Sequence, residues 1–104
     1  MTNRVLDTDS YKLSHFLQYP PETTEVSSYI EPRGGDLDSI VFFGLQSWLK
    51  TALGSPIRLD EVEQAERLAN AHIGVFNRAG WDHILEAHNG WLPVEIQALP
   101  EGSL

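Results

Sequence analysis

The most restrictive feature of this sequence is a polar turn and a short amphipathic segment ended by two prolines, DTDSYKLSHFLQYPP from Asp7 to Pro21. Its first three residues, Asp-Thr-Asp, all have side-chain oxygens that can accept from free N–H groups in the first turn of a helix. Apolar residues then recur at the spacing i, i+3, i+4 of one helix face, at Leu13, Phe16 and Leu17. Because the residue before a proline disfavours the α region, the sequence predicts a helix of about two turns that ends at Tyr19.

Asp9 and Tyr11 lie at the acidic N-terminal end of this predicted helix. Free backbone donors, a carboxylate and an aromatic ring in one place suit a small polar heteroaromatic ligand. The structural alternative is that Asp9 only caps the helix and Tyr11 is only a core ring. Taken without further information, the structural interpretation is the commoner one for such residues.

A second candidate site follows the predicted helix. Residues Thr23–Glu31 alternate apolar and polar side chains with period two, which predicts a half-buried strand. Pro32-Arg33-Gly34-Gly35 then interrupts the pattern. Glycines let successive N–H groups turn toward one point, and the forked guanidinium of Arg33 suits a phosphate. The alternative is a surface turn with a solvated arginine.

The rest of the chain predicts further short elements. A buried strand is expected at Ile40–Phe43, a helix with Leu45, Trp48 and Leu49 inward and Gly54 as its cap, and a helix over Asp60–Ile73. A helix capped by Asn77 and ended by Gly90 precedes a strand over Trp91–Leu99. The fold class predicted is therefore α+β, with about three helices and three to four short strands in one domain over residues 1–104.

This placement of helix faces also predicts which side chains are inside. The expected core consists of Phe42, Leu45, Trp48, Leu49, Leu68, Trp81, Ile84, Leu85 and Ile96. In the helix over Asp60–Ile73, Asp60 with Glu63 resembles a capping box, and Glu61 is expected to face water.

Composition excludes several classes of function. Fifteen acidic residues against seven basic ones give a net charge of −8, so neither a nucleic acid nor an anionic membrane is an expected partner. No apolar run is long enough to cross a membrane, and the N-terminus has no secretory h-region, so we expect a cytoplasmic protein. The chain has no cysteine, and its four histidines show no metal-ligand spacing, so no metal site is predicted.

Three stretches, in order along the chain, resemble one known family. TDSYKLSHFLQYPP is followed by VFFGLQSWL at Val41–Leu49 and by VFNRAGWDHILEAHNGWLPVEIQALPEG at Val75–Gly102. They are similar to the opening motifs of the nicotinamide phosphoribosyltransferases, which make nicotinamide mononucleotide and pyrophosphate from nicotinamide and phosphoribosyl pyrophosphate for NAD salvage. The resemblance extends over essentially the whole chain but only over the N-terminal part of the family's length.

The resemblance implies a small N-terminal domain of a type II phosphoribosyltransferase, without the C-terminal α/β barrel. It implies that Tyr11 stacks on the nicotinamide ring, Asp9 accepts from the carboxamide N–H₂, and Arg33 contacts phosphate, all across the interface of a homodimer. It also implies Mg²⁺ and ATP coupling for the full-length enzyme. No catalytic residue or metal ligand is carried over onto this chain, and the chain alone is expected to be inactive.

Several alternatives stand beside this interpretation. The chain ends just after the Pro100-Glu101-Gly102 turn, which suggests a truncated domain or a fragment of an enzyme. It could be a relative of the nicotinate phosphoribosyltransferases, whose opening motif is T-D-x-Y, although the S-Y-K-x-x-H run favours the nicotinamide branch. It could also be a non-catalytic module that dimerises or associates with the missing C-terminal part.

Overall fold

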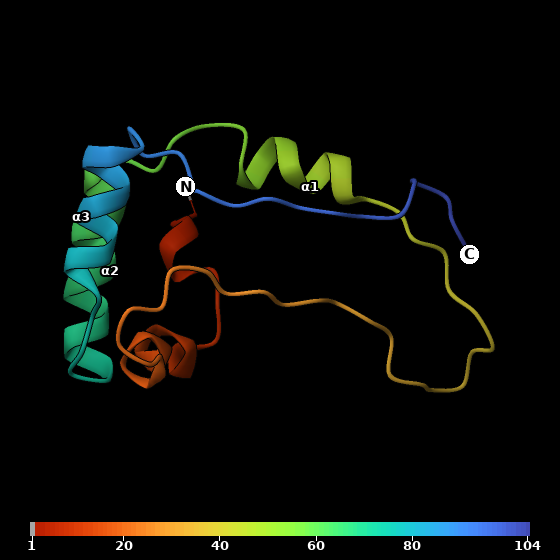
Figure 1. The fold of residues 1–104 in the computed structure, drawn as a ribbon, viewed down its shortest axis with the longest axis horizontal. Coiled ribbons are helices and arrows are strands. Elements are labelled where there is room, and N and C mark those ends of the chain that lie inside the picture. The colour runs from red at the N-terminus through yellow and green to blue at the C-terminus, as the bar shows by residue number, and fades with distance from the viewer. Residues whose placement is uncertain (1) are drawn as a thin grey trace.

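The computed structural model describes residues 2–104, which contain five helical segments joined by extended chain. Two 3₁₀ helices come first, η1 (Arg4–Leu6) and η2 (Ser10–Gln18), followed by the α-helices α1 (Leu45–Ala52), α2 (Leu59–His72) and α3 (Arg78–Ala87). Figure 1 shows α2 and α3 packed side by side, η1 and η2 next to them, and α1 set apart. None of these helices is long and apolar enough to cross a membrane.

The predicted α+β class is wrong, because no β-strand forms in the part of the chain that the structure describes. The predicted strands at Thr23–Glu31, Ile40–Phe43 and Trp91–Leu99 are extended but unpaired. Period-two alternation indicates an extended chain with two different faces, but a strand also needs a neighbour that completes its backbone hydrogen bonds. Within residues 2–104, backbone hydrogen bonds join the extended segments at Phe42, whose N–H donates to Ser103 O at 2.7 Å and whose carbonyl accepts from Gly102 N at 2.7 Å.

The segment between η2 and α1 forms a long arm that leaves the helical body (Figure 1). Most of its apolar side chains are exposed to solvent, with Tyr29 at 82% and Ile30 fully exposed. The radius of gyration is 16.1 Å, whereas a compact domain of this length has about 13 Å. The excess comes from this arm and from the C-terminal extended segment, which runs away from α3 past α1.

The core is small and lies between η1, the α1–α2 loop and α2. Its buried members are Val5, Ile57, Val62, Ala65 and Ala69, against which Leu6, Phe76, Trp81, Leu85 and Leu92 are partly buried. Of the predicted core, Trp81 and Leu85 do pack against this cluster. Trp48, Leu68 and Ile96 do not belong to it, since each is at least 45% exposed. Helical spacing alone identifies an apolar stripe, and a stripe is buried only where another element covers it.

The 3₁₀ geometry of η2 explains which of its apolar residues turn inward. The helix ends at Tyr19 before Pro20, as predicted, but it is a 3₁₀ helix rather than an α-helix. In a 3₁₀ helix the residues i and i+3 are aligned, so Leu13 and Phe16 share one half-buried side. Leu17, which an α-helix would place beside them, is 63% exposed.

The start of α2 differs from the predicted capping pattern. The N-cap is Arg58, and Glu61 at the third helical position accepts from the Arg58 N–H at 3.0 Å. This is the carboxylate half of a capping box, shifted two residues from the predicted Asp60–Glu63 pair. The prediction that Glu61 faces water is wrong: the residue is only 4% exposed and pairs with Arg4 at 3.1 Å.

Gly90, which follows α3, brings the end of that helix against the α1–α2 loop. Its φ of +84° is in the left-handed region, and its carbonyl accepts from Ile57 N at 2.7 Å. A Cβ at this position would lie 2.4 Å from Ile57 O and 3.0 Å from Pro56 Cβ. Only glycine therefore fits both the backbone angle and the close approach.

The buried Arg4–Glu61 pair yields the first prediction. Glu61→Ala leaves the Arg4 guanidinium, whose side chain is 16% exposed, without its carboxylate. Removing one partner of a buried pair costs about 3–5 kcal/mol, and we expect a loss of that size in the free energy of unfolding of the 104-residue chain, measured with urea. As a control, Asn70→Ala on the exposed side of α2 should change it by no more than about 0.5 kcal/mol. Equal effects of the two substitutions would contradict the structural role of Glu61.

Candidate functional site

Asp9 takes the N-cap position of η2 but does not cap it. Its backbone is extended, with φ −66° and ψ 138°, and its side chain makes no capping hydrogen bond. The carboxylate is 64% exposed and forms an ion pair with Lys12 Nζ at 3.9 Å. An exposed pair of this kind contributes little stability, so the fold does not depend on this carboxylate.

Tyr11 is the second residue of η2 and is not part of the core. It is 59% exposed, and its ring centroid lies 5.3 Å from that of His15 with a tilt of 55°. Its carbonyl accepts from Ser14 Oγ at 2.9 Å, within the same helix. Asp9 and Tyr11 are thus close neighbours on an exposed end of η2, and neither has the structural role that the simpler interpretation assigned to it.

Arg33 is not brought to this pair within the chain. It is exposed and lies in the arm between η2 and α1, which Figure 1 shows extending away from η2. Gly34 and Gly35 after it have φ of +91° and +132°, so the chain turns there in conformations that favour glycine. The structure therefore places two of the three predicted site residues together and the third on a separate, extended segment.

A shallow cleft of about 340 Å³ separates η2 from the start of α3. The side chains that line it include Lys12, His15 and Phe16 from η2, with Phe76 and Trp81 on the opposite side. Its charged lining residues, Arg4 and Lys12, are cationic in a chain of net charge −8, but Arg4 is engaged with Glu61. Asp9 and Tyr11 lie outside this cleft, so the base-binding residues predicted from the sequence are not in its wall.

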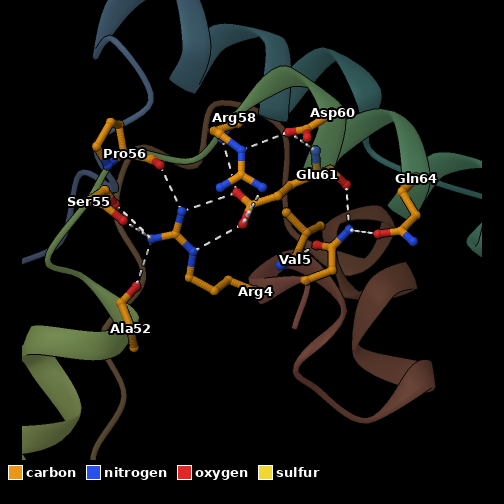
Figure 2. A network of polar contacts seen from close by, with 10 residues as sticks. Arg4, Val5, Ala52, Ser55, Pro56, Arg58, Asp60, Glu61 and Gln64 are labelled. Carbon is orange, nitrogen blue, oxygen red and sulfur yellow. Dashed lines mark hydrogen bonds and ion pairs between the residues drawn. The ribbon is translucent and has the colours of Figure 1, made fainter. Parts of the chain in front are cut away.

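Figure 2 shows a hydrogen-bonded group, here called the anchor, in which Arg4 contacts Ala52, Ser55, Pro56 and Glu61. Arg4 itself lies in η1, shortly before Asp9 in the chain. The guanidinium donates to Ser55 O at 2.7 Å, to Pro56 O at 2.7 Å and to Ala52 O at 3.3 Å. It also meets both carboxylate oxygens of Glu61, at 3.1 Å and 3.3 Å. One side chain of η1 therefore holds together the end of α1, the α1–α2 loop and the first turn of α2.

Asn3 adds a second set of contacts to this anchor. Its Nδ2 donates to Glu61 O at 2.8 Å and to Gln64 Oε1 at 2.9 Å, and its Oδ1 accepts from Val5 N at 3.0 Å. Val5 itself is 4% exposed and packs in the core. The sequence interpretation missed this group because it examined Asp60 and Glu63 as the capping pair. The available indication of this group in the sequence was Glu61, which stands three residues after Arg58.

The acidic residues of the chain are scattered rather than gathered. No three histidine, aspartate or glutamate side chains among residues 2–104 lie close enough to hold a metal ion. Mg²⁺ binds through one or two carboxylates together with substrate phosphates, in near-octahedral geometry.

Comparison with known proteins assigns the family. Residues 3–96 match the family described as "Nicotinamide phosphoribosyltransferase, N-terminal domain". The chain belongs to this family. It is 48% identical, over 98% of its length, to the nicotinamide phosphoribosyltransferase of Xanthomonas campestris pv. campestris (strain 8004). It is 33% identical, over 91% of its length, to that of Acinetobacter baylyi (strain ATCC 33305 / BD413 / ADP1). The match spans 22% of each relative, so the chain corresponds to about a fifth of their length.

One more carboxylate of this nicotinamide phosphoribosyltransferase segment, which the sequence interpretation treated only as part of a turn, has a structural role. Glu101 Oε2 accepts from Gly44 N at 2.8 Å, and its Oε1 accepts from Gln46 N at 2.9 Å. These backbone donors at the start of α1 lower the pKa of Glu101 below its usual range. The C-terminal turn therefore supplies the N-terminal cap of a helix more than fifty residues earlier.

The lowered pKa of Glu101 gives a prediction with a defined sign. The Gly44 and Gln46 N–H groups bind the ionised form of Glu101. Its contribution to the stability of the folded chain is therefore complete above the ordinary glutamate pKa. It is lost as the pH falls through the lower, folded-state value. We expect an NMR titration to give the Glu101 carboxyl a pKa below that of an ordinary glutamate.

The matching substitution is Glu101→Gln, which weakens the same two hydrogen bonds at neutral pH. Amide hydrogen exchange at Gly44 and Gln46 should become faster than in the unaltered chain. Glu95→Gln removes an equal charge from the same extended segment, where Glu95 accepts from Gln97 Nε2, and should leave hydrogen exchange at both amides unchanged. Unaltered exchange in Glu101→Gln would mean that this carboxylate does not cap α1.

Proposed function

We propose that this chain is the base-recognising N-terminal part of an enzyme of NAD salvage that joins nicotinamide to phosphoribosyl pyrophosphate. The proposal rests on membership of the nicotinamide phosphoribosyltransferase family and on the names of relatives that are 48% and 33% identical to the chain. In that reaction the pyridine nitrogen attacks C1′ of the ribose and pyrophosphate leaves. A segment of this kind contributes by placing the ring for attack, because a well-oriented reactant lowers the barrier substantially.

The observation that supports this role best is the exposure of Asp9 and Tyr11 at the start of η2. The Asp9 side chain does not cap the helix, and the Tyr11 ring is not buried, so neither residue type is accounted for by stability. An aromatic face and a carboxylate two residues apart are the groups that a neutral pyridine carboxamide needs. Tyr11 stacks on the ring, and Asp9 accepts a hydrogen bond from the carboxamide N–H₂.

The same carboxylate also distinguishes nicotinamide from nicotinate. An ionised Asp9 attracts the amide N–H₂ of the first and repels the carboxylate of the second. The N-terminal end of a helix favours anions by about 0.3–1 kcal/mol, which by itself would help nicotinate. A close contact between like charges at an interface costs several kcal/mol, so repulsion by Asp9 decides the preference.

Arg33 contributes to the same site from another copy of the chain. It stands on the exposed arm between η2 and α1, and this arm extends away from η2 (Figure 1). In a homodimer such an arm reaches the partner's site, where the guanidinium binds a phosphate oxygen through its forked donors. The remaining part of an enzyme of the relatives' length supplies the groups that bind pyrophosphate.

The substitution that tests this proposal is Asp9→Asn in the full-length enzyme that carries this segment. It removes the charge but keeps the size of the side chain. We expect the preference for nicotinamide over nicotinate, as the ratio of their kcat/KM values, to fall by about tenfold or more, roughly 1.4 kcal/mol. An unchanged ratio together with a lowered Tm would return Asp9 to the role of a structural residue.

Tyr11→Ala tests the other half of the site in the same enzyme. Loss of the stacking face should raise KM for both bases and leave their ratio nearly constant, because the ring contact is common to both. Tyr19→Ala is the matched control, since Tyr19 is also a half-exposed tyrosine of this region but lies at the opposite end of η2. Equal rises in KM for the two variants would show that Tyr11 has no particular part in binding the base.

A further inference from the structure

We propose that Arg4 and Glu61 are positioning residues for nicotinamide recognition, because they fix the place of Asp9 and Tyr11 on the body of the domain. This inference rests on the proposed function. Neither residue contacts the base; they act through η1 and the turn that joins η1 to η2.

The first step is that η2 is not held by polar contacts of its own. Among the residues described, no hydrogen bond or ion pair joins η2 to another helix, and none of its residues is buried. Leu13 and Phe16 are half-buried beside the shallow cleft, and the remaining contacts are local. The position of Asp9 and Tyr11 therefore depends on what precedes them in the chain.

The second step is that a short, hydrogen-bonded turn connects η2 to the anchor around Arg4. The Arg4 carbonyl accepts from Asp7 N at 3.3 Å, the Leu6 carbonyl from Thr8 N at 2.8 Å, and the Asp9 carbonyl from Lys12 N at 3.0 Å. These bonds leave little slack between Arg4 and the start of η2. A shift of η1 is consequently passed on to Asp9 and Tyr11.

The third step is that the Arg4 side chain determines where η1 lies. Its guanidinium contacts three backbone carbonyls and both oxygens of Glu61, and Val5 beside it is in the core. A planar fork with several fixed donors specifies orientation, which the single ammonium of lysine does not. A misplacement of about 1 Å at a reacting centre can reduce the rate on the order of 100-fold, so this specification matters for catalysis.

The test uses the double variant Arg4→Met/Glu61→Gln in the full-length enzyme that carries this segment. It leaves no unpaired buried charge and keeps an acceptor for the Arg58 N–H, so the domain is expected to fold. We expect kcat/KM for nicotinamide to fall about tenfold, mainly through KM, and the preference over nicotinate to narrow. The single variant Arg4→Lys should have a kcat/KM between those of the double variant and the unaltered enzyme.

The matched control is Arg78→Met, which removes an arginine that pairs with two carboxylates, Glu66 at 3.1 Å and Asp82 at 2.7 Å. The Arg78–Glu66 pair joins α2 to α3, and among the residues described neither pair of Arg78 involves η1. Arg78→Met should therefore lower Tm while the preference for nicotinamide stays the same. Asn3→Ala, a milder change in the anchor, should shift KM in the same direction as the double variant.

Two results would overturn the proposal. One is a folded Arg4→Met/Glu61→Gln enzyme, or a folded Asn3→Ala enzyme, with unaltered KM and preference. The other is an equal kinetic effect of Arg78→Met, which would make the loss a general consequence of lower stability. If Asp9→Asn changes the preference for nicotinamide while the anchor variants do not, the positioning proposal fails and the proposed function stands. If Asp9→Asn has no effect, the proposed function itself fails.

Discussion

The contact between Arg4 and Glu61 is the interaction on which the arrangement of this domain most depends. It joins η1 to the first turn of α2 and, through three carbonyls, to the end of α1 and the loop that follows. The hydrophobic core around it is small, with Val62 as its largest fully buried side chain. Directional polar contacts therefore do in this domain what a larger core does in others: they select one arrangement of the segments.

A buried ion pair is a costly way to hold a fold together. Apolar residues of similar volume would often give the same or higher stability, because both charges must leave water. What the pair adds is a fixed orientation, since the guanidinium meets its six acceptor atoms only in one position of η1. An orientation of this kind is useful where the next few residues must meet a ligand.

The local elements of this chain were predictable, and their partners were not. Helical periodicity and Pro20 located α2 and the end of η2, and the opening motif identified the family. The sequence could not show whether Tyr29 and Ile30 would be covered, because alternation describes a chain and not its neighbour. It also could not show that Glu61 is buried, since the amphipathic pattern places charges outside unless a distant cation such as Arg4 meets them.

The close approach of Gly90 to the α1–α2 loop links the substitutions that position 90 tolerates to the position of η1 near the other end of the chain. Any side chain there would displace the loop at Pro56 and Ile57, and Pro56 O is one of the acceptors of Arg4. A substitution at position 90, far away in sequence, would thus loosen the segment that carries Asp9. Positions 4 and 90 are therefore constrained together, and an exchange at either one must be accommodated by the same loop.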